Sequence, residues 1–143
     1  MSFDFKLIGG DLQVTPAGTI AIQVDDSKLR QDLLKILLTP IGSNKAYPWY
    51  GSPLGTAVIG RLLDPRILKS EILNSITFAI NNLIRLQKEQ ERSGQFLTPA
   101  EAISKILDVS VEQSIQDGRQ YNIGISVLTR RGNVINETFA LTP

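Results

Sequence analysis

The 143-residue sequence contains no cysteine and no histidine. Without cysteine it can form no disulfide, thiolate zinc site, iron–sulfur cluster or cysteine nucleophile. Without histidine it lacks Ser-His-Asp triads, imidazole metal ligands and imidazole acid–base catalysis. Any catalytic chemistry would have to come from carboxylates, Lys, Arg, Tyr, hydroxyl groups or the backbone. We predict no catalytic residue, no cofactor and no metal site.

A strong net charge is also lacking, because fifteen Lys and Arg residues nearly balance fourteen Asp and Glu residues. A formal charge of +1 provides little attraction to nucleic acids or anionic membranes, so neither is expected as a partner. No long apolar run follows the N-terminus, so we expect neither a signal peptide nor a membrane-spanning segment. The length and the 42% hydrophobic content predict a single globular domain over residues 1–143.

Alternating apolar and polar residues predict a small antiparallel β unit at the N-terminal end. Phe3, Phe5 and Leu7 alternate with polar residues, and the pattern resumes at residues 20–24 after Gly-containing turns. Leucine and isoleucine then recur at helical spacing over residues 29–38. The predicted N-cap candidates of this helix are Asp25, Asp26 and Ser27, and the Thr39-Pro40 step ends it.

Three further helix starts share one pattern, a capping side chain followed by proline at the first helical position. Ser52-Pro53 predicts a short helix to Leu63, Asp64-Pro65 predicts the longest helix over about residues 65–91, and the capping box Thr98-Pro99-Ala100-Glu101 predicts a brief helix to about Lys105. The longest helix would extend about 40 Å at 1.5 Å per residue.

The connection over residues 40–53 contains the only tryptophan of the chain. Trp49 and Tyr50 stand beside glycine and proline, a common way to fix a connection against the core. We predict local packing for both side chains. The alternative is an interface anchor, since aromatic residues are enriched where proteins bind one another.

The last third of the chain predicts three antiparallel strands. Apolar residues alternate between Leu107 and Ile115, again over residues 121–127, and finally over residues 135–141, with turn signals such as Asp117-Gly118 between them. Strands, then helices, then strands predict an α+β fold. In it a small antiparallel sheet (N-terminal β pair plus C-terminal three-strand meander) packs against a few helices, including the long one.

The final predicted strand carries a charge on its apolar face, because Glu137 shares that face with Ile135, Phe139 and Leu141. An inward-pointing charge is one way in which proteins protect an exposed sheet edge. The strand is therefore either a protected edge or an edge kept free for one partner strand. Both interpretations require that the strand lies at the edge of the sheet.

The order of these signals is specific. A helix beginning Leu29-Arg30-Gln31-Asp32-Leu33 ends in Leu37-Leu38-Thr39-Pro40-Ile41-Gly42, Trp49-Tyr50-Gly51-Ser52-Pro53-Leu54 follows, and Asp64-Pro65-Arg66 opens the long helix before the C-terminal strands. Over about residues 12–142 the chain resembles the baseplate wedge proteins of contractile phage tails, the GPW or gene-twenty-five-like family, also called sheath initiators. The charged Gly-Glu-Arg stretch frequent in that family is replaced here by Gly42-Ser43-Asn44-Lys45.

The resemblance implies a structural subunit of the tail baseplate that catalyses no reaction. In that family a Glu-Pro-Arg motif grips a helical core bundle of neighbouring wedge subunits, which implies this contact for Asp64, Pro65 and Arg66. The family's C-terminal strands template the first sheath ring by strand pairing. This implies a sheath-pairing edge formed by Val134, Ile135, Asn136, Glu137, Thr138, Phe139, Ala140 and Leu141.

The same resemblance implies where the protein works and what it binds. The expected partners are baseplate wedge proteins and the tail sheath protein, with six copies per particle and no small-molecule substrate. The expected location is the baseplate of a virion tail, after synthesis in the host cytoplasm.

A carboxylate-dependent peptidoglycan hydrolase is the alternative function, because members of the family have been labelled lysozyme-like. Glycoside hydrolysis requires two carboxylates facing one cleft, one of them with a raised pKa. The acids of this sequence are explained as helix caps, turn residues or surface residues. Glu112 and Glu137 are a pair that could face each other across the predicted strands. We expect no enzymatic activity.

Overall fold

The computed structural model describes residues 2–143 and confirms the α+β fold. The elements in chain order are β1 (Asp4–Phe5), β2 (Leu7–Ile8), β3 (Asp11–Leu12), β4 (Ile22–Gln23), α1 (Asp25–Leu38), α2 (Leu54–Ala57), α3 (Pro65–Arg92), β5 (Ile103–Gln113), β6 (Tyr121–Thr129) and β7 (Val134–Leu141). No helix within these residues is long and apolar enough to cross a membrane.

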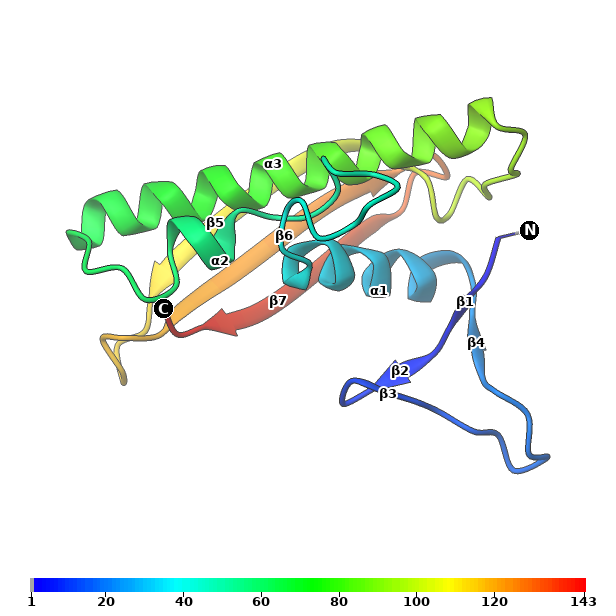
Figure 1. Ribbon diagram of the computed structural model, residues 1–143, viewed down its shortest axis with the longest axis horizontal. Coiled ribbons are helices and arrows are strands. Elements are labelled where there is room, and N and C mark those ends of the chain that lie inside the picture. Colours follow the sequence, from blue (N-terminus) through cyan, green and yellow to red (C-terminus); the bar gives the residue numbers. More distant parts are fainter. Residues whose placement is uncertain (1) are drawn as a thin grey trace.

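The three C-terminal strands form one antiparallel sheet in the order β5-β6-β7, as the alternation predicts (Figure 1). Every second side chain of β6 is buried, including Ile123, Ile125 and Val127. β7 runs along β6 without interruption, from Leu128 opposite Val134 to Tyr121 opposite Leu141. The register of β5 shifts twice, at residues 103–105 and 106–108, which gives this edge strand two irregularities.

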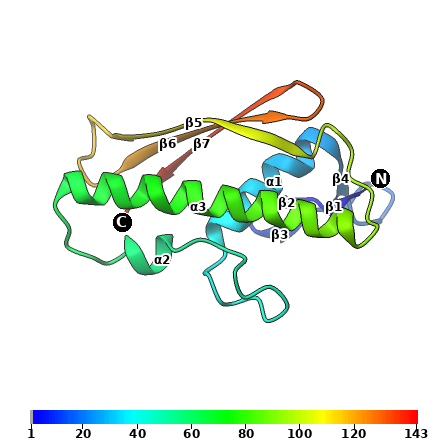
Figure 2. The ribbon, with the colours of Figure 1, turned by 90° about the horizontal axis from the view of Figure 1, so that it is seen from above.

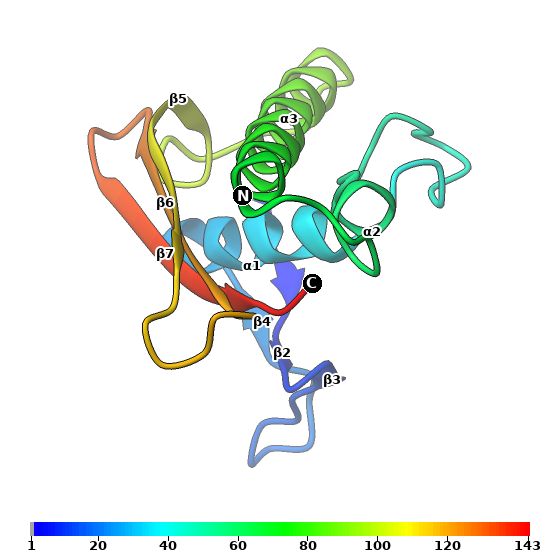
Figure 3. The ribbon, with the colours of Figure 1, turned by 90° about the vertical axis from the view of Figure 1, so that its left-hand side faces the viewer.

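Helices α1 and α3 cover one face of this sheet. Figure 3 shows the sheet on one side, α1 and α3 beside it, and α2 on the far side of the helices. α3 packs along β5, and α1 packs against α3 and β7. The core joins α1, α3 and the sheet through side chains that are almost completely buried, among them Leu33, Ile36, Ile72, Ile76, Ile80 and Ile125.

The N-terminal strands are antiparallel, as predicted, and form two separate two-stranded ladders, β1 with β4 and β2 with β3. They are not hydrogen-bonded to the three-stranded sheet. Together with their turns they form an extension that projects from the helices and the sheet (Figures 1 and 3). We call residues 3–23 the N-terminal ribbon.

The predicted helix after Thr98 is wrong, because β5 already begins at Ile103. Half of the capping box is present, since the Thr98 amide donates to Glu101 Oε1 at 2.8 Å. The Thr98 hydroxyl, however, donates to Asp25 Oδ1 at 2.7 Å and caps no helix. Gln87 of α3 donates to the Glu101 carbonyl and accepts from the Ile103 amide, which draws the chain into the sheet.

Two other helix boundaries differ from the prediction. The helix predicted from Ser52-Pro53 to Leu63 is the short α2, which ends at Ala57. The N-cap of α1 is Val24, without a side-chain cap. Asp25 takes a positive φ of 52° instead, a conformation that aspartate tolerates, and its carboxylate accepts the bond from Thr98. The start of α3 is as predicted.

Candidate protein-interaction surfaces

β7 is an edge strand: β6 pairs with one side of it, and no other strand of residues 2–143 pairs with the opposite side. At the turn between them the Thr129 amide donates to the Asn133 carbonyl at 2.9 Å. Hydrogen-bonded pairs alternate along an antiparallel ladder, so the odd-numbered residues of β7 bond to β6. The backbone N–H and C=O groups that point away from β6 belong to Val134, Asn136, Thr138 and Ala140. These four residues are half of the predicted Val134–Leu141 segment.

The side chains of the odd-numbered residues face the helices, as predicted. Ile135 is buried, and Phe139 and Leu141 are half-buried against the core. Glu137 lies between them on the same face and pairs with Arg30 of α1. The same guanidinium donates to the Asn136 carbonyl at 2.7 Å. The sequence indicated the inward charge, and only the structure reveals the arginine that neutralises it.

The Asp64-Pro65-Arg66 motif opens α3. Asp64 Oδ1 accepts the Arg66 amide at 2.9 Å, and proline occupies the first turn of the helix. The Arg66 side chain is exposed, and its guanidinium makes no ion pair or hydrogen bond within the described residues. The start of α3 and the C-terminal end of β7 lie at the same end of the molecule (Figures 1 and 2). The fold therefore places these two predicted contact regions at one end.

Residues 40–53 form a closed loop that begins and ends at one point. The Ser52 amide donates to the Thr39 carbonyl at 2.9 Å, and the Ile41 amide donates to the Ser52 carbonyl at 3.3 Å. Gly51 has a φ of 127°, and a Cβ there would lie 2.6 Å from the Thr39 carbonyl oxygen. Only glycine permits this close approach of the two backbones.

Trp49 and Tyr50 pack from this loop onto the rest of the chain, in agreement with the local-packing interpretation. Asn82 of α3 donates to the Trp49 carbonyl at 2.8 Å, and the Arg85 guanidinium lies 4.2 Å above the indole ring. Tyr50 is half-buried, and burial together with the nearby acidic groups of Asp32 and Asp4 raises its pKa to about 12. Both side chains stay partly exposed, so an additional anchor role remains a prediction.

Five of the fourteen carboxylates of the chain form ion pairs within residues 2–143. Ion pairs join Asp4 to Lys35, Asp32 to Lys28, Glu91 to Arg130 and Glu137 to Arg30. Glu101 is completely buried, with Lys28 Nζ 3.8 Å from one of its oxygens. Within residues 2–143 there is no cluster of three or more acidic side chains suited to a metal ion.

The suggestion that Glu112 and Glu137 face each other is wrong. Glu112 lies opposite Asn122, which lies opposite Ala140, and these side chains share the outer face. Glu137 lies opposite Ile125 on the inner face. Burial raises the pKa of the Asp32 carboxyl, although the ammonium group of Lys28 opposes the shift. The group nearest to this acid is thus an amine, not a second carboxyl group.

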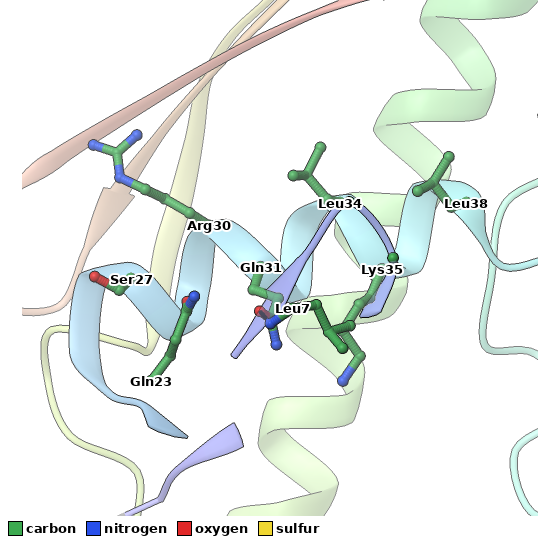
Figure 4. Close-up of a pocket in the computed structure, with 10 residues that line it drawn as sticks. Leu7, Gln23, Ser27, Arg30, Gln31, Leu34, Lys35 and Leu38 are labelled. Atoms are coloured by element: carbon green, nitrogen blue, oxygen red, sulfur yellow. Dashed lines mark hydrogen bonds between the residues drawn. The ribbon is translucent and has the colours of Figure 1, made fainter. Parts of the chain in front are cut away.

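The N-terminal ribbon is a further surface, and the sequence did not indicate that it would be exposed. Its large apolar side chains remain in solvent, with Phe3 at 56%, Ile8 at 56% and Val14 at 60% exposure. A groove of about 440 Å³ separates the ribbon from α1 (Figure 4). Leu7 of the ribbon and Leu34 and Leu38 of α1 line it.

Polar contacts attach the ribbon to α1. Gln31 Nε2 donates to the Phe5 carbonyl at 2.7 Å, and Gln31 Oε1 accepts the Leu7 amide at 3.0 Å. Lys35 Nζ donates to Asp4 Oδ2 at 2.6 Å. Burial alone would raise the pKa of the Asp4 carboxyl, but the bonds from Lys35 and Gln31 outweigh it and hold the pKa below its usual value.

Comparison with known proteins gives one informative result. No protein-family model matches the chain, and no curated protein matches it. Among solved structures it is similar to a protein from Geobacter sulfurreducens that is provisionally named a tail lysozyme, with a TM-score of 0.56 and 15% sequence identity. The similarity covers 81% of this chain and 88% of the other. At this identity it establishes a shared fold over most of both chains.

Proposed function

We propose that the protein is a structural subunit of a phage-type contractile tail, located in its baseplate. The fold supports this proposal, because the similar solved structure carries the name of a tail protein. The order of motifs along the sequence supports it independently. The observation that carries the proposal is the free edge of β7, where four residues direct their backbone groups away from the sheet.

In this proposal the β7 edge pairs with a strand of the tail sheath protein. An added strand gains affinity from main-chain hydrogen bonds, and alternate side chains give selectivity. Phe139 and Leu141, which are half-buried on the inner face of β7, would set the register through apolar contacts with the partner strand, whereas Ile135 is already buried in the core. The length of β7, residues 134–141, matches that of an ordinary strand, so a partner strand can pair along all of it.

The second contact of the proposed adaptor is the start of α3, which would attach to the baseplate wedge. Arg66 is suited to this role, because its backbone amide completes the helix cap while its guanidinium binds no other group of residues 2–143. A guanidinium presents a planar fork of donors that matches carboxylates and backbone carbonyl groups at the end of a helical bundle. Six copies around the tail axis would each join one sheath subunit to the wedge.

We also propose that the protein catalyses no reaction. The name of the similar structure makes a peptidoglycan hydrolase the competing function, and that chemistry requires two carboxylates in one cleft. The one carboxylate pair that the sequence suggested, Glu112 and Glu137, lies on opposite faces of the sheet, which supports the structural role. A clearing assay on purified peptidoglycan checks this, and activity that a single carboxylate substitution abolishes would contradict the proposal.

The two contacts can be separated by capture of tail proteins from cells that produce the native particle. The full-length tagged chain should capture sheath and wedge subunits, identified by mass. Thr138→Pro removes an outward amide and should abolish sheath capture alone, whereas Thr138→Ala keeps that amide and should behave as wild type. Arg66→Ala should abolish wedge capture alone, with Lys69→Ala as the control one turn away. Capture of no tail protein by the wild type would contradict the proposed function.

A further inference from the structure

The outward side of β7 is partly occupied by a side chain from α1. The carbonyl of Asn136 points away from β6, as the alternation of the ladder requires. Arg30 donates to this carbonyl at 2.7 Å, from the side where the N–H group of a neighbouring strand would donate. The Arg30 guanidinium thus supplies a hydrogen bond that the backbone N–H group of a further strand would otherwise donate.

Glu137 holds that arginine in place. Its side chain is 19% exposed and lies on the inner face of β7, where an unpaired carboxylate would be unfavourable. The Arg30 side chain is 44% exposed, so water can reach the pair. Exposed ion pairs contribute little to stability, and a strand that brings several main-chain hydrogen bonds can therefore displace this one. The contact of Arg30 with β7 can therefore give way to a partner strand.

We propose that Arg30 and Glu137 form a removable cap on the β7 edge, which keeps it from pairing with a second copy of this chain and leaves it to a partner strand. The identity of that partner rests on the proposed function, whereas the cap concerns the isolated protein. Unprotected edges of this kind pair with one another, and natural proteins block them with charges.

The register of a self-pair shows why these two residues oppose it. If two copies pair antiparallel with Asn136 opposite Thr138 of the second copy, the two Glu137 side chains lie directly opposite each other. Like charges in this position destabilise a strand pair. If Thr138 lies opposite itself, Asn136 pairs with Ala140, and each Arg30 must leave the carbonyl that it occupies. In both registers the cap opposes pairing.

The test is the self-association of the isolated full-length protein, measured by sedimentation over a range of concentrations. Arg30→Ala frees the Asn136 carbonyl and should associate at least tenfold more tightly than wild type, in the register with Thr138 opposite itself, because the two Glu137 side chains do not face each other there. Arg30→Gln should shift in the same direction. Arg130→Ala is the matched control, because it removes another exposed arginine–carboxylate pair, Arg130 with Glu91, and it should behave as wild type.

A second readout connects any association to the β7 edge. In associated Arg30→Ala the amide protons of Thr138 and Ala140 should exchange at least tenfold more slowly than in wild type. The double variant Arg30→Ala/Thr138→Pro should not associate. The cap is refuted if Arg30→Ala and Arg30→Gln associate no more than wild type, or if the double variant associates as Arg30→Ala does. Capture of sheath protein is a separate measurement, so failure of the cap and failure of the proposed function are distinguishable.

Discussion

The N-terminal ribbon and the C-terminal sheet are both antiparallel and both rich in alternating apolar residues, but they bury them to very different extents. In β6 the inward side chain of Ile125 is 1% exposed, whereas Val14 of the ribbon is 60% exposed. The sheet is covered by α1 and α3. The ribbon is attached to α1 by Gln31 and Lys35 and leaves an open groove beside them.

Alternation of apolar and polar residues creates an apolar face, but a covering element decides whether that face becomes part of the core. The sheet has long strands that span both helices, so its inner face is dry. The ribbon has ladders of two residues each, and a short two-stranded unit has little stability of its own in water.

The largest expected effect is a loss of stability when a core side chain of the sheet is shortened. Ile125→Ala removes a core side chain and should lower the free energy of unfolding by about 2–5 kcal/mol, through lost transfer energy and a cavity. Val14→Ala in the ribbon should change it by less than about 0.5 kcal/mol, as exposed positions do. Urea unfolding of the two variants and the wild type measures both values. Equal losses would show that the ribbon is buried in solution.

A smaller effect tests the attachment of the ribbon. Gln31→Ala removes the bonds to the Phe5 carbonyl and the Leu7 amide, each worth about 1 kcal/mol net. The Leu7 amide should therefore exchange about tenfold or more faster, while the amides of β6 keep their rates. Hydrogen exchange followed by NMR measures both regions in one sample. Gln116→Ala, at an exposed position, is the control and should leave the Leu7 rate unchanged.

The smallest expected effect is a pH dependence in the attachment of the ribbon to α1. The pKa of Asp4 is lower in the folded chain than its ordinary value of 3.8. A depressed carboxyl pKa contributes stability above that value, and the contribution is lost as the pH falls through the folded pKa. Acidification below pH 3.8 should thus loosen the ribbon before the sheet, as seen in the NMR shift of the Leu7 amide.

The control for this titration is Asp4→Asn, in which the Leu7 shift should no longer depend on pH in that range. A local signal is needed because Asp32 acts in the opposite direction. Burial raises its pKa, so its contribution to stability falls as the pH rises through the range between its unfolded and folded pKa values. An unchanged titration curve in Asp4→Asn would show that another group controls the attachment.

Much of the fold was predictable because local signals fix it. Asp64-Pro65 starts α3 by capping and by a preset φ, and the chain ends the helix at Ser93-Gly94, where glycine takes a positive φ of 89°. The strands of the sheet follow from alternation. The helix predicted after Thr98 failed because its capping signal is local, whereas the bonds from Gln87 that place Ile103 in β5 come from a distant helix.

The candidate surfaces were predictable only in part. Glu137 on an apolar face indicated an edge strand, and β7 is one. The partner of Glu137 was not predictable, because Arg30 lies 107 residues away and nothing local connects the two. The exposure of the ribbon was equally hidden, since alternation does not reveal whether a helix covers the face. Whether Asp64, Pro65, Arg66, Trp49 and Tyr50 touch other proteins stays a prediction.

The loop that Gly51 closes has one more consequence, which concerns spectroscopy. Trp49 is the only indole in the sequence, so tryptophan emission from this protein originates at a single point on the surface of α3. The Arg85 cation lies 4.2 Å from the centre of that ring, within the range of a cation–π contact. Release of the loop would move the indole away from this cation and into water, and the emission wavelength of the indole would change. The protein thus contains its own optical reporter of events at this loop, readable without any attached label.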